Sequence, residues 1–298
     1  MPITVHPLSP AIAAEIRGVD ISGPLDAQQV GLIRQAWLDH CVLLFRDQSL
    51  DANQQRAFVR NFGELGGRKA RVEPQNYRKP DDATGGPDYN ADSMLVSNIR
   101  ENGKPIGVLP DGEMWFHHDM CYAAQPNRAS FLYSIEVPSC GGDTIFANMY
   151  EAYAHMPQTL KDRIEGRTVL QAFDEYQDRR IELNEKPLSQ IPHCFQPIVL
   201  RHPDTGRRAL YVNRLMSHRI EGLSDNDSEE LLEELLAYSE DPAIQYQHVW
   251  RPGDLLMWDN LCSTHARTDF PPEERRLMRR YTLAGAPVTA AWERAPAA

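Results

Sequence analysis

The length, composition and charge of the chain exclude several classes of protein. With 298 residues, of which 42% are hydrophobic and 24% charged, the chain can bury a sizeable core and does not have the composition of a disordered protein. Its formal net charge of -11 argues against a nucleic-acid or anionic-membrane partner. A site that binds an anion must therefore depend on its own local arginines.

Cysteine usage and the absence of long apolar stretches indicate the compartment. The five cysteines are scattered and include no C-x-x-C pair, so neither a disulfide framework nor a zinc ribbon is indicated. The first residues lack a basic segment followed by an apolar core, and no stretch approaches about 18 consecutive apolar residues. We therefore expect a soluble cytoplasmic protein.

The first part of the chain predicts short strands and two capped helices. Residues 18–23 are typical of a strand and turn, and Asp26 can cap a helix that continues to about residue 40. The apolar run 41–45 favours a short buried strand. Asp51 then caps a second helix, with Gln54 three residues later in capping-box position.

Two later segments have the composition of loops over a site. Residues 66–111 are rich in glycine, proline and mixed charges, interrupted by a strand-like stretch at Met94–Ser97, and residues 174–196 are charged and aperiodic. Loops of this length in a compact domain are usually lids or binding loops. We therefore expect lid segments at about 66–111 and 174–196.

The rest of the chain is rich in strands. The alternation of residues 128–137 is the clearest strand pattern, and Ser224 can cap an amphipathic helix. Further strands are predicted at 143–147, 197–201, 208–212, 246–250, 255–258 and 276–283, and short helices at 150–155 and 157–165. Because no linker separates two domains, we predict one α+β domain over residues 1–298, built on a barrel or sandwich.

The stretch from Trp115 to Tyr122 carries the first chemical motif. Extended backbone puts His117 and Asp119 on one face and His118 on the other. One imidazole and one carboxylate are two of the three ligands of a 2-His-1-carboxylate Fe(II) site. A distant second histidine is then required.

His265 and a basic strand form the second motif. Arg276 and Arg280 follow His265 by eleven and fifteen residues and share one face of the predicted strand, whereas Arg279 lies on the other. The two arginines could simply pair with carboxylates of an acidic protein. Alternatively, one guanidinium could grip the carboxylate of a 2-oxoacid cosubstrate in bidentate fashion.

These motifs together resemble a known enzyme family. The resemblance rests on 18–22 (GVDIS), 44–48 (LFRDQ), 62–65 (FGEL), 115–119 (WFHHD), 141–144 (GGDT), 258–260 (WDN), His265 and the arginine strand. H-x-D alone is a weak motif, but the combination is specific. The chain is similar to the taurine dioxygenase and 2,4-dichlorophenoxyacetate dioxygenase family of Fe(II)/2-oxoglutarate-dependent oxygenases.

The resemblance implies a fold and a set of site residues. The core would be a double-stranded β-helix (jelly roll, cupin-like) with flanking helices. The iron ligands would be His117, Asp119 and His265, and the cosubstrates 2-oxoglutarate and O2. Thr144 and Arg276 would hold the far carboxylate of 2-oxoglutarate. A carboxylate at Asp119 favours oxygenation, because related halogenases have a small residue there.

The resemblance also suggests a substrate class. Arg280 matches the position that faces the anionic group of the substrate or lies close to the cosubstrate. Tyr122 occupies the place of a substrate-facing aromatic, although an ordinary core aromatic is an equal alternative, and Asn98 could approach the substrate. Residues 66–69 (GGRK) replace the histidine and tyrosine that taurine dioxygenase directs at sulfonate. We therefore expect a small organic acid with an apolar or aromatic body, not taurine.

Two other functions fit the same residues. The first is a 2-oxoglutarate-independent metal oxygenase or hydrolase that uses the three ligands without Arg276. The second is a non-catalytic binding protein for a small acid on the same fold.

The family resemblance also implies a homo-oligomer, either a dimer or a tetramer.

Overall fold

A computed structural model of the chain describes residues 2–66, 93–108, 112–173, 178–181, 183 and 187–292. The larger of its sheets has seven strands. In sheet order these are β1 Thr4–Pro7, β2 Ala14–Arg17, β3 Val42–Phe45, β16 Leu255–Asp259, β8 Ala129–Glu136, β18 Leu277–Leu283 and β4 Met94–Ser97. Neighbouring strands of this sheet pair antiparallel except β2 and β3, which are parallel.

The second main sheet has four strands. In sheet order these are β15 Gln245–His248, β9 Thr144–Asn148, β17 Ser263–Arg267 and β7 Met114–His117. Three smaller sheets complete the described strands. They are β11 His193–Pro197, β10 Thr168–Ala172 and β14 Ser217–Ile220; β12 Val199–Arg201 with β13 Arg208–Leu210; and β5 Arg100–Glu101 with β6 Lys104–Pro105.

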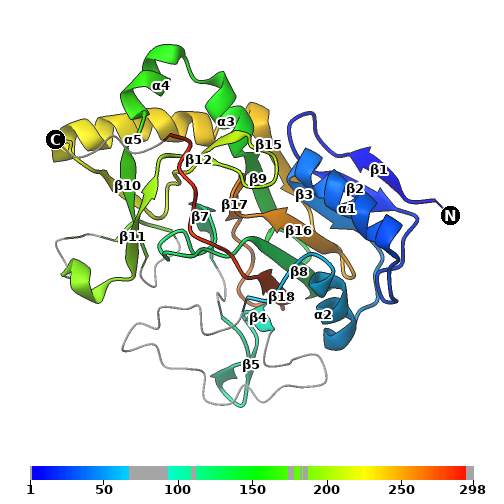
Figure 1. Cartoon of the computed structure of the whole chain (residues 1–298). Helices are drawn as coiled ribbons and strands as arrows, with labels where there is room; N and C mark the ends of the chain where they lie inside the picture. The colour runs from blue at the N-terminus through cyan, green and yellow to red at the C-terminus, as the bar shows by residue number, and fades with distance from the viewer. Residues whose placement is uncertain are drawn as a thin grey trace.

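The helices form two groups, visible in Figure 1. Along the seven-stranded sheet lie α1 Ala27–His40 and α2 Ala52–Arg60, and α3 Met149–His155, α4 Gln158–Ile164 and α5 Asp225–Ser239 gather at the top of the view. Asp26 and Asp51 both form the complete capping box, and Ser224 caps α5. The helix starts predicted from capping residues are thereby confirmed.

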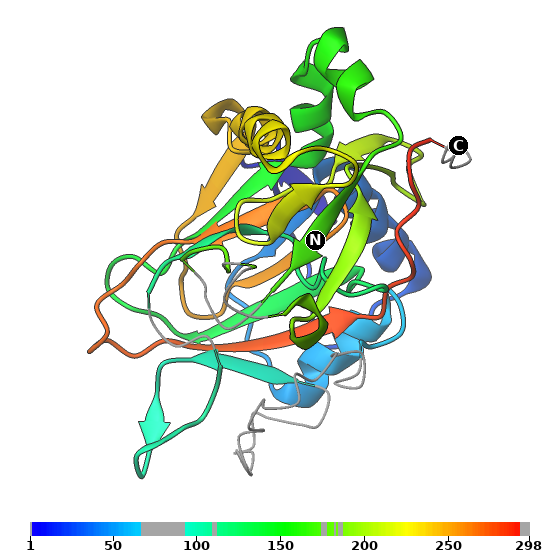
Figure 2. The same ribbon diagram turned by 90° about the vertical axis from the view of Figure 1, so that its left-hand side faces the viewer.

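The alternation of side chains in the large sheet separates two packing faces. One face packs against α1 and α2, where Phe45 and Phe131 meet Phe58. The opposite face contributes Leu44 and Trp258 to a second cluster that also holds side chains of the four-stranded sheet. The view in Figure 2 is turned by 90° and shows the strands and the helices at the top from the side.

The observed architecture confirms an α+β chain, while the jelly-roll connectivity stays a prediction. The strand expected at 18–23 is wrong: these residues form bends and a turn, and the strand β2 precedes them. The strands that were not predicted include β10 and β14, because five and four residues of mixed polarity give little period-2 signal.

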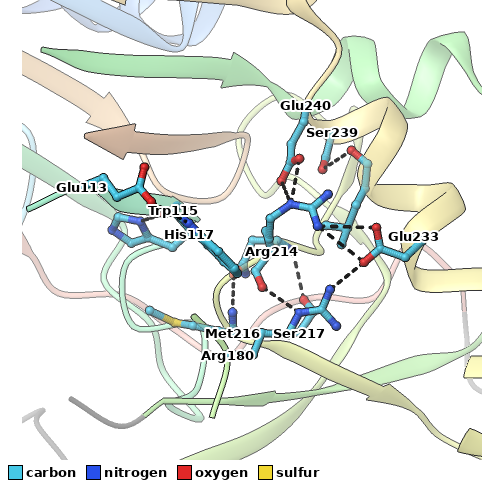
Figure 3. Close-up of polar contacts among 12 residues, drawn as sticks. Glu113, Trp115, His117, Arg180, Arg214, Met216, Ser217, Glu233, Ser239 and Glu240 are labelled. Atoms are coloured by element: carbon cyan, nitrogen blue, oxygen red, sulfur yellow. Dashed lines mark hydrogen bonds and ion pairs between the residues drawn. The ribbon is translucent and has the colours of Figure 1, made fainter. Parts of the chain in front are cut away.

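Only parts of the two expected lid segments belong to the described residues. Residues 67–92, 109–111, 174–177, 182 and 184–186 lie outside them, so the lid assignment stays a prediction. The end of the second segment forms β11, which pairs with β10. Arg180, earlier in that segment, donates to the Arg214 carbonyl oxygen and pairs with Glu233 of α5 (Figure 3).

None of the helices among the described residues is long and apolar enough to span a bilayer.

Candidate metal centre

Two neighbouring strands bring together histidines that are distant in the sequence. His117 ends β7 and His265 is the central residue of β17, and they stand opposite each other in the antiparallel pairing of these strands. Their ring centroids are 4.1 Å apart. The pairing of β17 with β7 is irregular between His265 and Arg267, and such irregularities commonly re-aim side chains beside functional sites. Strand pairing thus supplies the second histidine that the His117 motif requires.

Asp119 joins the two histidines from the turn after β7. Its Oδ1 lies 4.0 Å from Nε2 of His117, and ligand atoms of all three residues lie within 4.8 Å of one another. Each of the three residues is at most 8% exposed. The expectation that His117 and Asp119 share a face is therefore met, although Asp119 lies beyond the strand rather than in it.

The hydrogen bonding of His117 prepares it to bind a metal. Its Nδ1 lies 2.9 Å from the carbonyl oxygen of Trp115, an acceptor that places the ring proton on Nδ1 (Figure 3). The lone pair of Nε2 is then available on the side of Asp119. Burial lowers the pKa of His117 and, further, that of His265, so both rings are neutral at pH 7.

Asp119 is held as an anion by two partners from the seven-stranded sheet. Ser130 Oγ donates to its Oδ2 at 2.5 Å, and Arg280 Nη2 lies 3.2 Å from its Oδ1. Burial alone would raise the pKa of Asp119, but the charge of Arg280, the two neighbouring histidines and the hydrogen bond from Ser130 together outweigh it and hold the pKa well below its ordinary value. The centre therefore offers two neutral imidazoles and one oriented carboxylate.

Arg276 is a buried cation for which the described part of the chain provides no anionic partner. It is 2% exposed, and among the described residues no partner hydrogen-bonds to its Nε or Nη1. Its backbone is fixed, because Ser97 Oγ donates to its carbonyl oxygen and its N–H donates to Asn98. Burial, and then the charge of Arg267, lower the pKa of Arg276 to about 9. An unpaired buried guanidinium is costly, and a carboxylate of a ligand would compensate it.

Thr144 is the first residue of β9 and is buried. Its Oγ1 accepts a hydrogen bond from Trp250 Nε1 at 3.0 Å. A hydroxyl that accepts in this way keeps its own proton for donation to an anion. The residues present therefore fit a 2-oxoacid with a second carboxylate.

The residues predicted to contact the substrate, Arg280, Tyr122 and Asn98, have different partners in the structure. Arg280 is paired with Asp119, as in the alternative reading in which the arginines meet carboxylates of the protein. Tyr122 is half-buried and stacks on Phe173 at 5.3 Å, and its contact with substrate stays a prediction. The Asn98 side chain donates to the carbonyl oxygens of Pro272 and Glu274 and accepts from Arg276 N–H.

These contacts give Asn98 a different role from the one expected. Its amide nitrogen and its carbonyl oxygen both bind the backbone before β18, which leaves the side chain little capacity for a substrate. Asn98 therefore fixes the start of the arginine strand, and its contact with a substrate stays a prediction.

Two residues near the centre were missed in the sequence. Ser130 orients Asp119, and Arg267 is 8% exposed and follows His265 on β17. The alternation of residues 128–137 puts Ser130 on the face opposite Phe131, which could have indicated its position. Arg267 follows His265 by two residues, so a strand at 263–267 would have predicted that both side chains share a face. The sequence did not predict β17 as a strand.

His118 points away from the centre, as predicted. It is fully buried, its ring lies 4.3 Å from that of Tyr211, and its Nδ1 lies 3.5 Å from the Asn213 amide nitrogen. A second buried group with ligand-type atoms is formed by His202, Asp259 and Cys262. There, Arg128 forms an ion pair with Asp259 and supplies the positive charge that a metal would otherwise bring.

The fold and this donor set define a class. Two neutral imidazoles and a carboxylate, all buried and converging from two strands and a turn, are the ligand set of non-haem Fe(II) oxygenases. The profile of the "Taurine catabolism dioxygenase TauD, TfdA family" matches residues 4–282. The chain belongs to this family of Fe(II)/2-oxoglutarate-dependent dioxygenases, which confirms the resemblance seen in the sequence.

Relatives and solved structures agree with that assignment. The chain is 36% identical to the pentalenolactone F synthase of Streptomyces avermitilis, covering 94% of this chain and 93% of the relative. It is 31% identical to the alpha-ketoglutarate-dependent 2,4-dichlorophenoxyacetate dioxygenase of Cupriavidus pinatubonensis, covering 95% and 98%. The structure of AAD-2 in complex with Mn(II) and N-oxalylglycine matches with a TM-score of 0.77 at 27% identity, covering 97% and 99%.

Proposed function

We propose that this enzyme hydroxylates a small organic acid with an apolar or aromatic body, coupled to conversion of 2-oxoglutarate and O2 to succinate and CO2. In this proposal His117, Asp119 and His265 are the iron ligands. One oxygen atom of O2 enters the substrate and the other enters succinate. Where the hydroxylated carbon adjoins an ether oxygen, the product is a hemiacetal that breaks down with cleavage of the ether.

The observation that carries the proposal is the unpaired, buried guanidinium of Arg276. It lies four residues before Arg280, which pairs with the ligand Asp119, and the other described buried arginines have partners, so a ligand carboxylate would compensate its charge. Arg276 and Thr144 would bind the far carboxylate of 2-oxoglutarate and so fix its orientation. Bound iron would supply the oxygen chemistry, which is the property of the cofactor.

The other residues of the centre orient groups and exclude water. Ser130 and Arg280 each bind one oxygen of Asp119, which holds that carboxylate in one orientation toward the two imidazoles. Because all three ligands are buried, a bound substrate meets little bulk water. Arg280, whose Nε has no hydrogen-bond partner among the described residues, is the residue we assign to the substrate carboxylate.

The substrate class rests on relatives and on residues 66–69. The chain resembles enzymes named for 2,4-dichlorophenoxyacetate and for (S)-phenoxypropionate, which are both acids with an aromatic body, at 31% and 32% identity. It lacks the histidine and tyrosine that taurine dioxygenase places after the corresponding FGEL segment. Residues 67–69 lie outside the described residues, so this contrast rests on sequence alone.

A substrate panel tests the proposal. Aryloxyacetates, 2-aryloxypropionates, polycyclic carboxylic acids, taurine and an alkyl sulfate are each incubated with the enzyme, Fe(II), 2-oxoglutarate and O2, and succinate and product are measured. We expect stimulation by one of the carboxylic acids with an apolar body and none by taurine. Stimulation by taurine or the alkyl sulfate alone, or by no acid while iron is bound, would overturn the substrate class.

Two matched arginine variants test the cosubstrate assignment. Arg276→Met removes the unpaired guanidinium, whereas Arg275→Met removes its exposed neighbour, which pairs with Glu136. We expect only Arg276→Met to weaken 2-oxoglutarate binding. Full activity in Arg276→Met would favour an oxygenase that does not use this cosubstrate site.

The assembly and compartment expected from the sequence, a dimer or tetramer in the cytoplasm, are also part of the proposal. Sedimentation equilibrium of the purified chain tests the assembly, and a monomer at all concentrations would contradict it.

A further inference from the structure

Arg267 lies beside the proposed cosubstrate residues but has no part in the roles assigned above. It is the last residue of β17 and is 8% exposed. In the regular pairing of β17 with β9, Arg267 stands opposite Thr144, as His265 stands opposite Phe146. Directly opposed residues of antiparallel strands share a face of the sheet. Arg267, Thr144 and His265 therefore extend from the same face.

The guanidinium groups of Arg267 and Arg276 share one aromatic neighbour. Both contact the buried ring of Phe270, with each guanidinium carbon 5.8 Å from the ring centroid. The positive charge of Arg267 contributes to lowering the pKa of Arg276, after burial. A carboxylate that binds at this end of the site is therefore attracted by the charges of both arginines.

Arg267 in addition connects this end of the site to the start of the metal-binding strand. Its Nε and Nη2 both donate to the carbonyl oxygen of Gly112, at 3.1 and 2.7 Å. Gly112 has a φ of 86° and lies two residues before β7, the strand that ends at His117. A fork of two N–H groups on one oxygen is a contact that lysine cannot reproduce.

We infer that Arg267 determines cosubstrate specificity, restricting the site to 2-oxoacids that carry a second carboxylate. The inference rests on the proposed binding of that carboxylate by Arg276 and Thr144. The charge of Arg267, beside Thr144 and on the same aromatic ring as Arg276, attracts the far carboxylate, an attraction that a 2-oxoacid without this group does not gain. The Gly112 contact holds the guanidinium in this position, so Arg267 acts as a positioning residue as well as a charge.

Binding of two 2-oxoacids of equal chain length tests the inference without turnover. The Mn(II)-loaded enzyme is titrated calorimetrically with 2-oxoglutarate and with 2-oxopentanoate, which lacks the far carboxylate. In Arg267→Met we expect 2-oxoglutarate to bind about 10- to 100-fold more weakly, as for loss of a charge-assisted interaction. Binding of 2-oxopentanoate should change by less than about threefold, because it gains nothing from the charge.

Conservative and control variants separate charge from structure. Arg267→Lys keeps the charge and should retain most of the preference for 2-oxoglutarate, even where loss of the Gly112 fork lowers the thermal unfolding midpoint. Arg275→Met, an exposed arginine, should behave as the wild type. If Arg267→Met fails to fold, the lysine variant decides: a preference lost in that folded protein overturns the charge-based role.

The outcomes distinguish this inference from its premise. Equal weakening of both 2-oxoacids in Arg267→Met, or no weakening of either, would overturn the specificity role and leave Arg267 with a structural one. Unchanged 2-oxoglutarate binding in Arg276→Met would instead remove the proposed function on which the inference depends. If Arg267→Met and Arg276→Met both weaken the binding of 2-oxoglutarate selectively, the result supports both the specificity role of Arg267 and the proposed function.

Discussion

Two buried groups of this protein contain similar ligand-type residues and have opposite properties. The first is His117, Asp119 and His265, and the second is His202, Asp259 and Cys262. In both groups burial would raise the pKa of the aspartate, and nearby positive charge keeps it low instead. A buried histidine beside an ionised aspartate therefore does not by itself distinguish a metal site from a structural network.

The hydrogen bonds of the histidines do distinguish the two groups. His117 Nδ1 meets the carbonyl oxygen of Trp115, which leaves the Nε2 lone pair for a metal. His202 Nδ1 instead accepts from the backbone N–H groups of Asp204 and Thr205, which places its proton on Nε2, directed at Asp259. The partner of the imidazole thus decides whether a lone pair remains.

The ionisation states of the ligand-type side chains separate the two groups in the same way. Asp259 is neutralised by its ion pair with Arg128, which lies over the ring of Trp37 at 4.7 Å. Burial raises the pKa of the Cys262 thiol well above its ordinary value, so it is not the thiolate that a metal requires. The second group thus lacks an ionised third ligand, whereas His117, Asp119 and His265 each offer a ligand atom in the protonation state that binds a metal.

The largest expected effect is loss of the metal from the first group. Asp119→Ala should lower Mn(II) or Fe(II) affinity by more than about 100-fold, beyond the loss typical of a residue that only supports a ligand, and abolish 2-oxoglutarate turnover. Calorimetric Mn(II) titration measures the affinity. His202→Asn is the control and should keep one metal per chain. A second metal in the wild type that His202→Asn removes would contradict the division between the groups.

The next effect is on stability and belongs to the second group. Asp259→Asn leaves Arg128 buried without its main counter-ion, which should lower the free energy of unfolding by about 3–5 kcal/mol. Asp204→Asn removes the exposed partner of Arg128 and should cost less than about 1 kcal/mol. Urea unfolding measures both. Loss of metal binding in folded Asp259→Asn would show that the two groups are not independent.

A smaller effect is expected from the residue that orients Asp119. Ser130→Ala removes the hydrogen bond to Oδ2 and should weaken metal binding about 10- to 100-fold without unfolding the chain. Ser134→Ala, four residues further along the same face of β8, is the control, because Ser134 donates to the backbone carbonyl oxygen of Arg251. Equal metal affinity in Ser130→Ala and the wild type would remove Ser130 from the site.

The smallest effect concerns a histidine outside both groups. Burial lowers the pKa of His218 from 6.5 to about 4 in the folded protein, and its Nε2 lies 3.2 Å from the Ala172 carbonyl oxygen. Because the unfolded chain binds this proton more tightly, the contribution is full above pH 6.5 and is lost as the pH falls to about 4.

Allowing for the partial exposure of His218, this loss should amount to about 1–2 kcal/mol in the metal-free protein. Unfolding in urea between pH 7 and 4 measures the slope, and His218→Gln should make it shallower. An unchanged slope in that variant would assign the pH dependence to other buried histidines.

Residues with local signals were predictable from the sequence. The capping boxes at Asp26 and Asp51 define their helices without reference to tertiary structure. The alternation of 276–283 correctly separates Arg280 from Arg279, which binds Gln55 and the Leu50 carbonyl oxygen behind the sheet. The resemblance to the family, confirmed by the family profile, supplied the reaction class.

Residues whose roles depend on tertiary contacts were not predictable. β17 is fully buried yet polar, with the sequence STHAR, so no hydrophobic pattern identifies it as a strand. The pairing of Arg280 with Asp119 and the use of Asn98 by the backbone arise between segments about 160–180 residues apart. The periodicity of a sequence reports local structure and gives no information about contacts between such distant segments.

A crystal structure grown with Mn(II) and N-oxalylglycine would test the central claim most directly. N-Oxalylglycine has the skeleton of 2-oxoglutarate with N–H in place of one CH2 group. The account predicts a single Mn(II) anomalous peak between His117, Asp119 and His265, with the far carboxylate of N-oxalylglycine on Arg276. A peak at His202 and Asp259, or a ligand whose far carboxylate leaves Arg276 unpaired, would contradict it.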